Sequence, residues 1–163
     1  MKAPVPNAYF FNLRSEFQVA LLATVNAANV ELLAFDPDYS EWAINTPGFD
    51  QALRAFFKRN PRARLRMMIT DVNRLTREYP RLVSILRTFA HVAECRVVPL
   101  KFAHLSETML IADRTSALRR PICSSCKGVL RALDLEYSGG QRERFEELWE
   151  ACQEVFQPQL WGV

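Results

Sequence analysis

The chain has little of what phosphate-loop and membrane proteins need. It has only five glycines in 163 residues, and none of them falls in a Gly-x-Gly-x-x-Gly or Walker A pattern. No apolar run approaches the roughly 18 residues of a membrane span, and the start of the chain, Met1 to Pro4, lacks the apolar segment of a signal peptide. We therefore expect no nucleotide-type phosphate loop, no membrane span and no cofactor, and a cytoplasmic location.

Lysine is also scarce, so arginine carries most of the positive charge. Only four of the 21 basic residues are lysines, and the formal net charge is +3. Arginine presents a planar fork of donors that suits phosphate or carboxylate. Solvated faces and ordinary ion pairs give the same composition, however, and the charge falls short of the basic footprint of a dedicated nucleic-acid binder. Nucleic acid is therefore a weakly supported partner.

The rest of the composition indicates one globular domain over residues 1–163, because 49% of the residues are hydrophobic. Apolar spacing predicts helices at 13–28, 46–59, 80–93 and 141–156, a short helical turn at 71–78, and a flexible Ser138-Gly139-Gly140 before the last helix. Short apolar runs predict strands at 30–35, 64–70, 95–100, 107–112, 116–120 and 128–133. This alternation predicts an α/β fold with a mixed, largely parallel sheet flanked by helices, to which the later strands add in antiparallel fashion.

One segment, Ser106-Glu107-Thr108-Met109-Leu110-Ile111-Ala112-Asp113, resembles the reactive strand of phospholipase-D-like enzymes, which carry His-x-Lys-x-x-x-x-Asp. Ser106 and Thr108 stand where the nucleophile and the phosphate clamp would be. The element order, the 114–120 strand and the 144–150 helix are similar to one phospholipase-D-like half, over nearly the whole chain. More narrowly, residues 110–114, Leu118-Arg119-Arg120-Pro121 and the Phe-x-x-Leu-Trp helix resemble an uncharacterised bacterial family of such domains, some appended to acetyltransferases.

The resemblance implies a homodimer, since active members bring two histidines from two halves to one site. Imidazole titrates near neutrality and can serve as nucleophile or proton donor, whereas Ser106 would need its own base and Thr108 cannot supply the positive charge of the lysine. Arg120-Pro121 also replaces small residues, so that side chain partly fills the substrate pocket. We therefore expect a non-catalytic binding or regulatory domain. The alternatives are a divergent phosphodiesterase that uses His104 and a dimerisation module without a small ligand.

Arginines near the altered motif offer a remnant phosphate site. The candidate ligand-binding residues are Ser106, Thr108, Asp113, Arg114, Arg119 and Arg120. Guanidinium forks bind phosphoryl groups well, which makes a phosphate-bearing ligand a candidate partner besides another protein. Alternate residues of a strand point in opposite directions, however, so structural ion pairs are the competing interpretation.

Two further groups of residues suggest metal binding only weakly. Cys123-Ser124-Ser125-Cys126 has the spacing of half a zinc site, but no second pair matches it, so free thiols and a disulfide formed on oxidation remain alternatives. Asp36, Asp38 and Glu41 lack the glycine and the terminal glutamate of a calcium loop. We interpret these three acids as turn and helix-cap residues.

Overall fold

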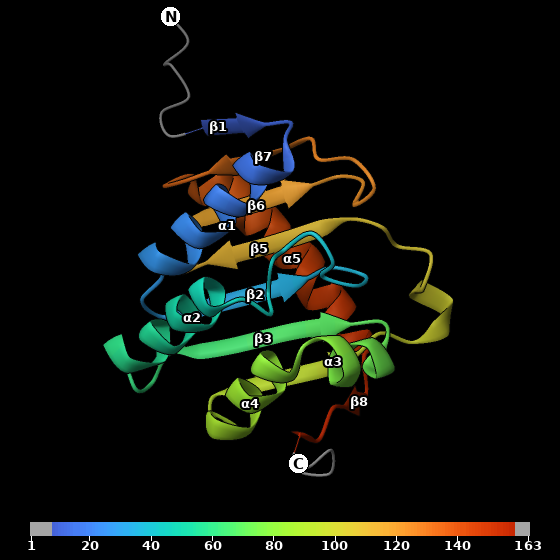
Figure 1. The fold of residues 1–163 in the computed structure, drawn as a ribbon. Coiled ribbons are helices and arrows are strands. Elements are labelled where there is room, and N and C mark those ends of the chain that lie inside the picture. The colour runs from blue at the N-terminus through green and yellow to red at the C-terminus, as the bar shows by residue number, and fades with distance from the viewer. Residues whose placement is uncertain (1–7, 159–163) are drawn as a thin grey trace, which may run out of the picture.

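The computed structural model describes residues 8–158 and contains one eight-stranded sheet, in the order β1-β7-β6-β5-β2-β3-β4-β8 (Figure 1). The strands are Ala8–Phe11 (β1), Glu31–Phe35 (β2), Arg64–Ile69 (β3), Ala93–Val97 (β4), Thr108–Ala112 (β5), Ser116–Arg120 (β6), Gly128–Arg131 (β7) and Glu154–Val155 (β8). The helices are Arg14–Ala27 (α1), Pro47–Arg59 (α2), Val72–Glu78 (α3), Pro80–Thr88 (α4) and Leu135–Ala151 (α5). The expected mixed α/β fold is confirmed.

The parallel part of the sheet is smaller than expected. Within residues 8–158, β2 pairs with β3 and β3 with β4 in parallel, while the other five pairings are antiparallel. The antiparallel share is large because β5, β6 and β7 follow one another through short connections, which only antiparallel neighbours allow. The expectation that later strands add in antiparallel fashion is therefore right, whereas parallel pairing is limited to the three neighbouring strands β2, β3 and β4.

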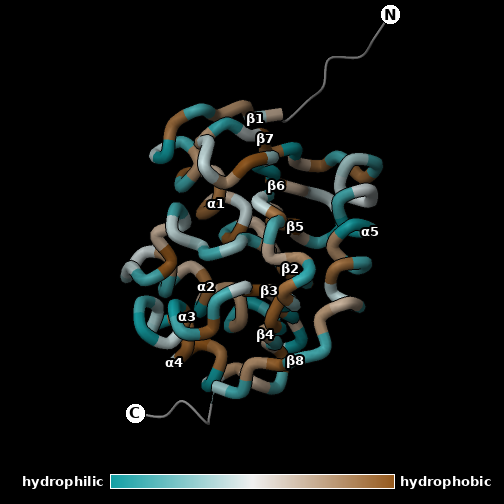
Figure 2. The backbone as a smooth tube through the Cα atoms, turned by 90° about the vertical axis from the view of Figure 1, so that its right-hand side faces the viewer, coloured by the Kyte–Doolittle hydropathy of each residue, from teal (hydrophilic) through white to brown (hydrophobic). Residues whose placement is uncertain are grey.

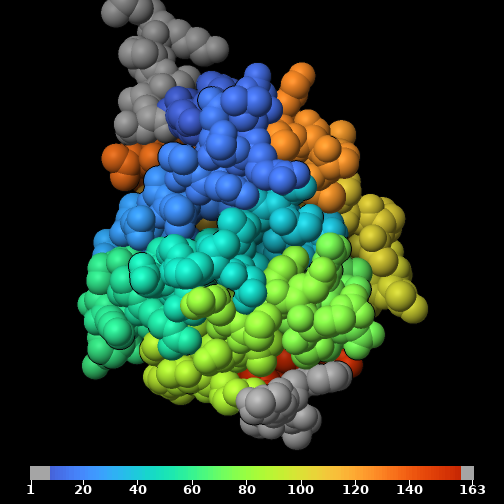
Figure 3. Space-filling view, viewed as in Figure 1, coloured from blue at the N-terminus to red at the C-terminus, as the bar shows by residue number. Residues whose placement is uncertain are grey.

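Helices cover the sheet on both faces, but unequally. In Figure 2, α1 to α4 lie on one side of the sheet and α5 lies alone on the other. The first side holds the larger apolar cluster, and Figure 3 shows its helices forming a continuous surface. The α5 side holds a smaller cluster that includes Phe145, Trp149 and Cys152. Cys152 packs there as a small hydrophobic residue, with 1% of its surface exposed.

Two helices differ clearly from the prediction, and the last one, expected to reach residue 156, ends at Ala151. The last helix begins at Leu135 and contains Ser138-Gly139-Gly140, because Asp134 caps it by accepting the backbone N–H of Tyr137. The fourth helix ends at Thr88, where Phe89 stacks on Phe57 and its carbonyl accepts the N–H of Ala93. None of the helices within residues 8–158 is long and apolar enough to cross a bilayer.

Candidate functional site

The altered motif lies at one edge of the sheet, where β2 and β6 end and β5 begins. The register sets Phe35 opposite Met109 and Thr108 opposite Arg120, so Asp36, just after β2, lies beside Thr108. Directly opposed residues have their side chains on the same face of the sheet. The fold therefore brings an acid, a hydroxyl and a guanidinium together, and we call these three residues the Asp36 cluster.

The three side chains of the Asp36 cluster bind one another. The Thr108 hydroxyl donates to Asp36 Oδ2 over 2.5 Å, and Arg120 Nη2 donates to the same oxygen over 3.2 Å. Arg120 Nε and Nη2 also donate to Thr108 Oγ1, over 3.2 and 3.1 Å. The side chains of Asp36 and Arg120 are each 1% exposed. This is a buried ion pair with a hydroxyl between its partners.

Asp36 receives three further donors. Trp42 Nε1 donates to Oδ2 over 3.1 Å, and the backbone N–H groups of Asp38 and Tyr39 donate to Oδ1 over 3.0 and 2.8 Å. Tyr39 has a φ of 59°, which turns the chain sharply after β2. Five donors therefore surround one carboxylate, as they would surround a bound anion. The Asp36 carboxylate therefore occupies the place that a bound anion would take among these donors.

Arg120 is held on its other sides by apolar surface. Its guanidinium carbon lies 4.2 Å from the centre of the Phe17 ring, a favourable cation–π arrangement. Its third nitrogen, Nη1, is buried and has no hydrogen-bond partner among residues 8–158. The expectation that Arg120 fills space at the altered motif agrees with this placement, and its charge is directed at Asp36 and Thr108.

The candidate catalytic residues lie outside the strand. Ser106 is exposed in the loop before β5, and its carbonyl accepts the N–H of Cys123 over 2.5 Å. His104 is exposed in the turn after the 3-10 helix Leu100–Phe102. The proposed role of His104 requires that the strand extend back to it, but β5 begins only at Thr108. His104 therefore does not share a strand face with Ser106.

The remaining candidate ligand residues do not join Thr108 and Arg120. Asp113 lies at the opposite end of β5, where its carboxylate accepts the N–H groups of Asn29, Val30 and Glu31 over 2.8, 2.7 and 3.0 Å. Arg114 follows it, 73% exposed and 3.9 Å from Glu31. Asp113 therefore joins β5 to the start of β2.

Arg119 points to the other face of the sheet. It lies 3.4 Å from the buried Glu107, which also binds Arg144. Of the six residues, the structure thus brings only Thr108 and Arg120 into direct side-chain contact.

One of the two loop cysteines, Cys123, lies within electrostatic reach of the Asp36 cluster. Cys123 and Cys126 are free thiols, each partly exposed, in the loop between β6 and β7. Burial raises the pKa of Cys123, Asp36 and Asp38 raise it further, and Arg120 opposes them. Within residues 8–158, no three His, Cys, Asp or Glu side chains gather as metal ligands would.

The sequence did not reveal Asp36 as a site residue, nor its contact with Trp42. Its role in the turn is correctly predicted, since one oxygen accepts the N–H groups of Asp38 and Tyr39. The other oxygen binds Arg120, 84 residues away. The available signal was Arg120 itself, because a buried arginine needs an acid, but nothing local in the sequence names the partner.

Comparison with known proteins identifies the family. A family model described as "Domain of unknown function (DUF7931)" matches residues 13–158. The chain belongs to this DUF7931 family. No curated protein matches it.

Solved structures share the fold of this DUF7931 chain at low identity. The phospholipase D family member Nuc from Salmonella typhimurium is 13% identical, with a TM-score of 0.64 over 90% of this chain and 96% of that one. TrmBL2, an archaeal chromatin protein with a novel mode of DNA binding, is 15% identical, with a TM-score of 0.69 over 95% of this chain. The chain spans only 57% of the length of TrmBL2. The phospholipase-D-like fold is therefore confirmed.

Proposed function

We propose that this chain is a phospholipase-D-like domain without phosphodiesterase activity, which acts by binding or regulation. One observation carries the proposal: Thr108, which the sequence resemblance aligns with the phosphate clamp, is buried and hydrogen-bonded to Asp36 and Arg120. A substrate phosphate there would have to displace a carboxylate that already has five donors. Separating the two partners of a buried ion pair of this kind is strongly destabilising.

The chemistry at this edge supports the same conclusion. Phosphoryl transfer through a covalent intermediate needs an activated nucleophile and a proton donor for the leaving group. Ser106 is an exposed loop residue with a hydroxyl in place of an imidazole, and Thr108 bears no charge. His104 is in an exposed turn outside β5. The histidine of this segment therefore does not stand at position 106, where the resemblance implies the nucleophile.

A turnover assay tests the proposal. Wild-type protein, His104→Ala and Ser106→Ala are incubated with bis-(p-nitrophenyl) phosphate and with short DNA, beside an active phospholipase-D-like nuclease. We expect no turnover above the buffer rate in any variant. Turnover that His104→Ala abolishes would establish the divergent phosphodiesterase instead, and turnover that Ser106→Ala abolishes would establish a serine enzyme.

A second candidate function, dimerisation, is favoured by the outer surface of α1. Residues 18–30 contain no charged side chain, although Val19 is 62% and Val30 59% exposed. Ala23 and Ala27 line an apolar groove of about 320 Å³ together with Leu133. Contiguous exposed apolar surface marks interaction sites, and a second copy would give the simplest closed arrangement, an isologous dimer.

Light scattering tests this candidate. We expect the wild type at twice the 18.8 kDa of the chain and Val19→Glu at the mass of one chain. Gln51→Glu introduces the same charge on the exposed face of α2 and should leave the dimer intact. A wild-type monomer would refute dimerisation, and an unchanged mass for Val19→Glu would remove α1 from the interface.

A further inference from the structure

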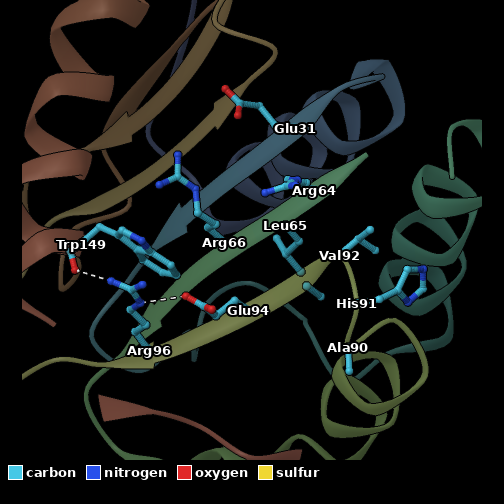
Figure 4. Close-up of a pocket in the computed structure, with 11 residues that line it drawn as sticks. Glu31, Arg64, Leu65, Arg66, Ala90, His91, Val92, Glu94, Arg96 and Trp149 are labelled. Atoms are coloured by element: carbon cyan, nitrogen blue, oxygen red, sulfur yellow. Dashed lines mark hydrogen bonds and ion pairs between the residues drawn. The ribbon is translucent and has the colours of Figure 1, made fainter. Parts of the chain in front are cut away.

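The α5 side of the sheet is only partly covered, and it holds an open groove of about 450 Å³ (Figure 4). The groove lies over β3 and β4, with Trp149 of α5 at one end and His91, from the turn after α4, at the other. It is remote from the Asp36 cluster, because it lies over the first residues of β3 and β4 instead of the ends of β2 and β6. None of the observations behind the proposed function involves this groove.

Strand alternation explains why this surface is charged. Arg64 and Arg66 face the groove, whereas Leu65 and Met67 between and beyond them belong to the larger apolar cluster on the opposite side. Residues two apart on a strand lie roughly 7 Å from one another on the same face. The two arginines therefore leave the same face of β3 at neighbouring positions, and both line the groove.

Two of the arginines in the groove are rigidly placed. Arg66 Nη1 donates to Glu146 over 3.1 Å, and its guanidinium lies 5.3 Å from the Trp149 ring. Arg96 lies 4.1 Å from the same ring, with Nε donating to Glu94 over 2.8 Å and Nη1 to the Trp149 carbonyl over 3.1 Å. Because these contacts already order both side chains, ligand binding would not cost their conformational entropy.

Arg64 differs from these two arginines. It is exposed, and within residues 8–158 it forms no side-chain hydrogen bond or ion pair. All five of its donors are available in a fork that matches a phosphate or carboxylate group. The groove thus combines one free guanidinium with two that are fixed.

From these contacts we propose that the groove binds a small molecule through one oxyanion group, phosphate or carboxylate, with Arg64 and Arg66 as its ligands. The inference rests on the proposed binding role of the domain and assigns that role a place. The volume is within the roughly 300–1,000 Å³ of small-molecule sites.

The acids in the groove favour a small ligand over nucleic acid. Glu31 and Glu94 line it beside the arginines, and they would repel a continuous phosphate backbone. A single anionic group can approach Arg64 while hydroxyl or amino groups of the same molecule face these carboxylates. Salt dependence separates the two, since backbone binding weakens steeply as salt rises.

Thermal unfolding of wild type, Arg64→Ala and Arg62→Ala tests the site. Arg62 is exposed two residues earlier and does not line the groove, so its removal makes the same charge change elsewhere. The probes are inorganic phosphate, glycerol 3-phosphate, citrate and a short DNA duplex. A ligand of the native state raises the unfolding midpoint by mass action. We expect a small oxyanion probe to raise it for wild type and Arg62→Ala, with affinity weakened about tenfold or more in Arg64→Ala.

The remaining outcomes overturn the inference in distinguishable ways. Equal shifts in all three proteins would place the binding elsewhere. A shift with DNA alone that is steeply salt-dependent would establish a nucleic-acid surface, and no shift with any probe would refute the site. Turnover of bis-(p-nitrophenyl) phosphate by the same protein preparations would contradict the proposed lack of phosphodiesterase activity while leaving the groove assignment intact.

Discussion

Removal of the Arg120 charge should destabilise the protein more than removal of any exposed cation. Arg120→Met keeps an apolar stem over Phe17 but leaves the Asp36 carboxylate buried without its cation. Breaking a buried pair by removing one partner costs about 3–5 kcal/mol. Since small domains are stable by only about 5–15 kcal/mol, this is a large share of the total.

Two further variants separate the charge from the packing. In Asp36→Asn/Arg120→Met both charges are absent, so we expect part of the lost stability to return. Arg14→Met breaks the ion pair with Glu41, in which Arg14 is 65% exposed. Exposed pairs contribute about 0–1 kcal/mol, so this variant controls for the loss of a surface arginine.

Urea unfolding followed by circular dichroism measures these differences, provided that the dependence on denaturant is the same for all variants. The reasoning is refuted if Arg120→Met loses no more stability than Arg14→Met. It is also refuted if the double variant is less stable than Arg120→Met. That result would mean that the unpaired Asp36 carboxylate is not the source of the lost stability.

Three smaller predictions concern the ends and the open face of the sheet. Asp113→Ala should cost about 1–3 kcal/mol, because three backbone N–H groups lose their acceptor, whereas unchanged urea stability would contradict this. Gly128→Ala should destabilise by about 1–3 kcal/mol, since a Cβ there would collide with the Phe11 ring; calorimetry showing an equal or higher midpoint would refute it. The hydrogen bond from Arg66 lowers the pKa of Glu146, so its contribution to stability is present above the unfolded pKa of about 4.3 and is lost as pH falls through the lower folded value. Glu146→Gln should therefore flatten the stability profile below about pH 4, and an unchanged acid limb would contradict that assignment.

Much of the fold follows from local patterns in the sequence. The runs at 30–35 and 116–120 carry short apolar segments between turn residues, and β2 and β6 form there. Thr46 and Pro47 begin α2, as predicted, with the Thr46 hydroxyl accepting the Phe49 N–H. The strands β1 and β8 were missed because they are only four and two residues long and are stabilised by pairing with distant strands.

The candidate site was predictable only in part. The resemblance that sets Ser106 and Thr108 at the nucleophile and clamp positions comes from the sequence itself and stays a prediction. That Arg120 would point inward to Asp36, and Asp113 away to the start of β2, depends on register and on which strands become neighbours. That Arg64 stays exposed in the groove likewise depends on the fold, because the single helix α5 covers that face of the sheet only in part.

The strand β1 has a consequence for solubility. The family match begins at residue 13, after β1 ends at Phe11. A chain shortened to that boundary would lose Phe11, which is 4% exposed and packs on Phe17. It would also uncover the backbone N–H and C=O groups of β7, and a bare strand edge pairs readily with other chains. Such a shortened protein should aggregate where the longer one stays dispersed, although every residue of the family match is retained.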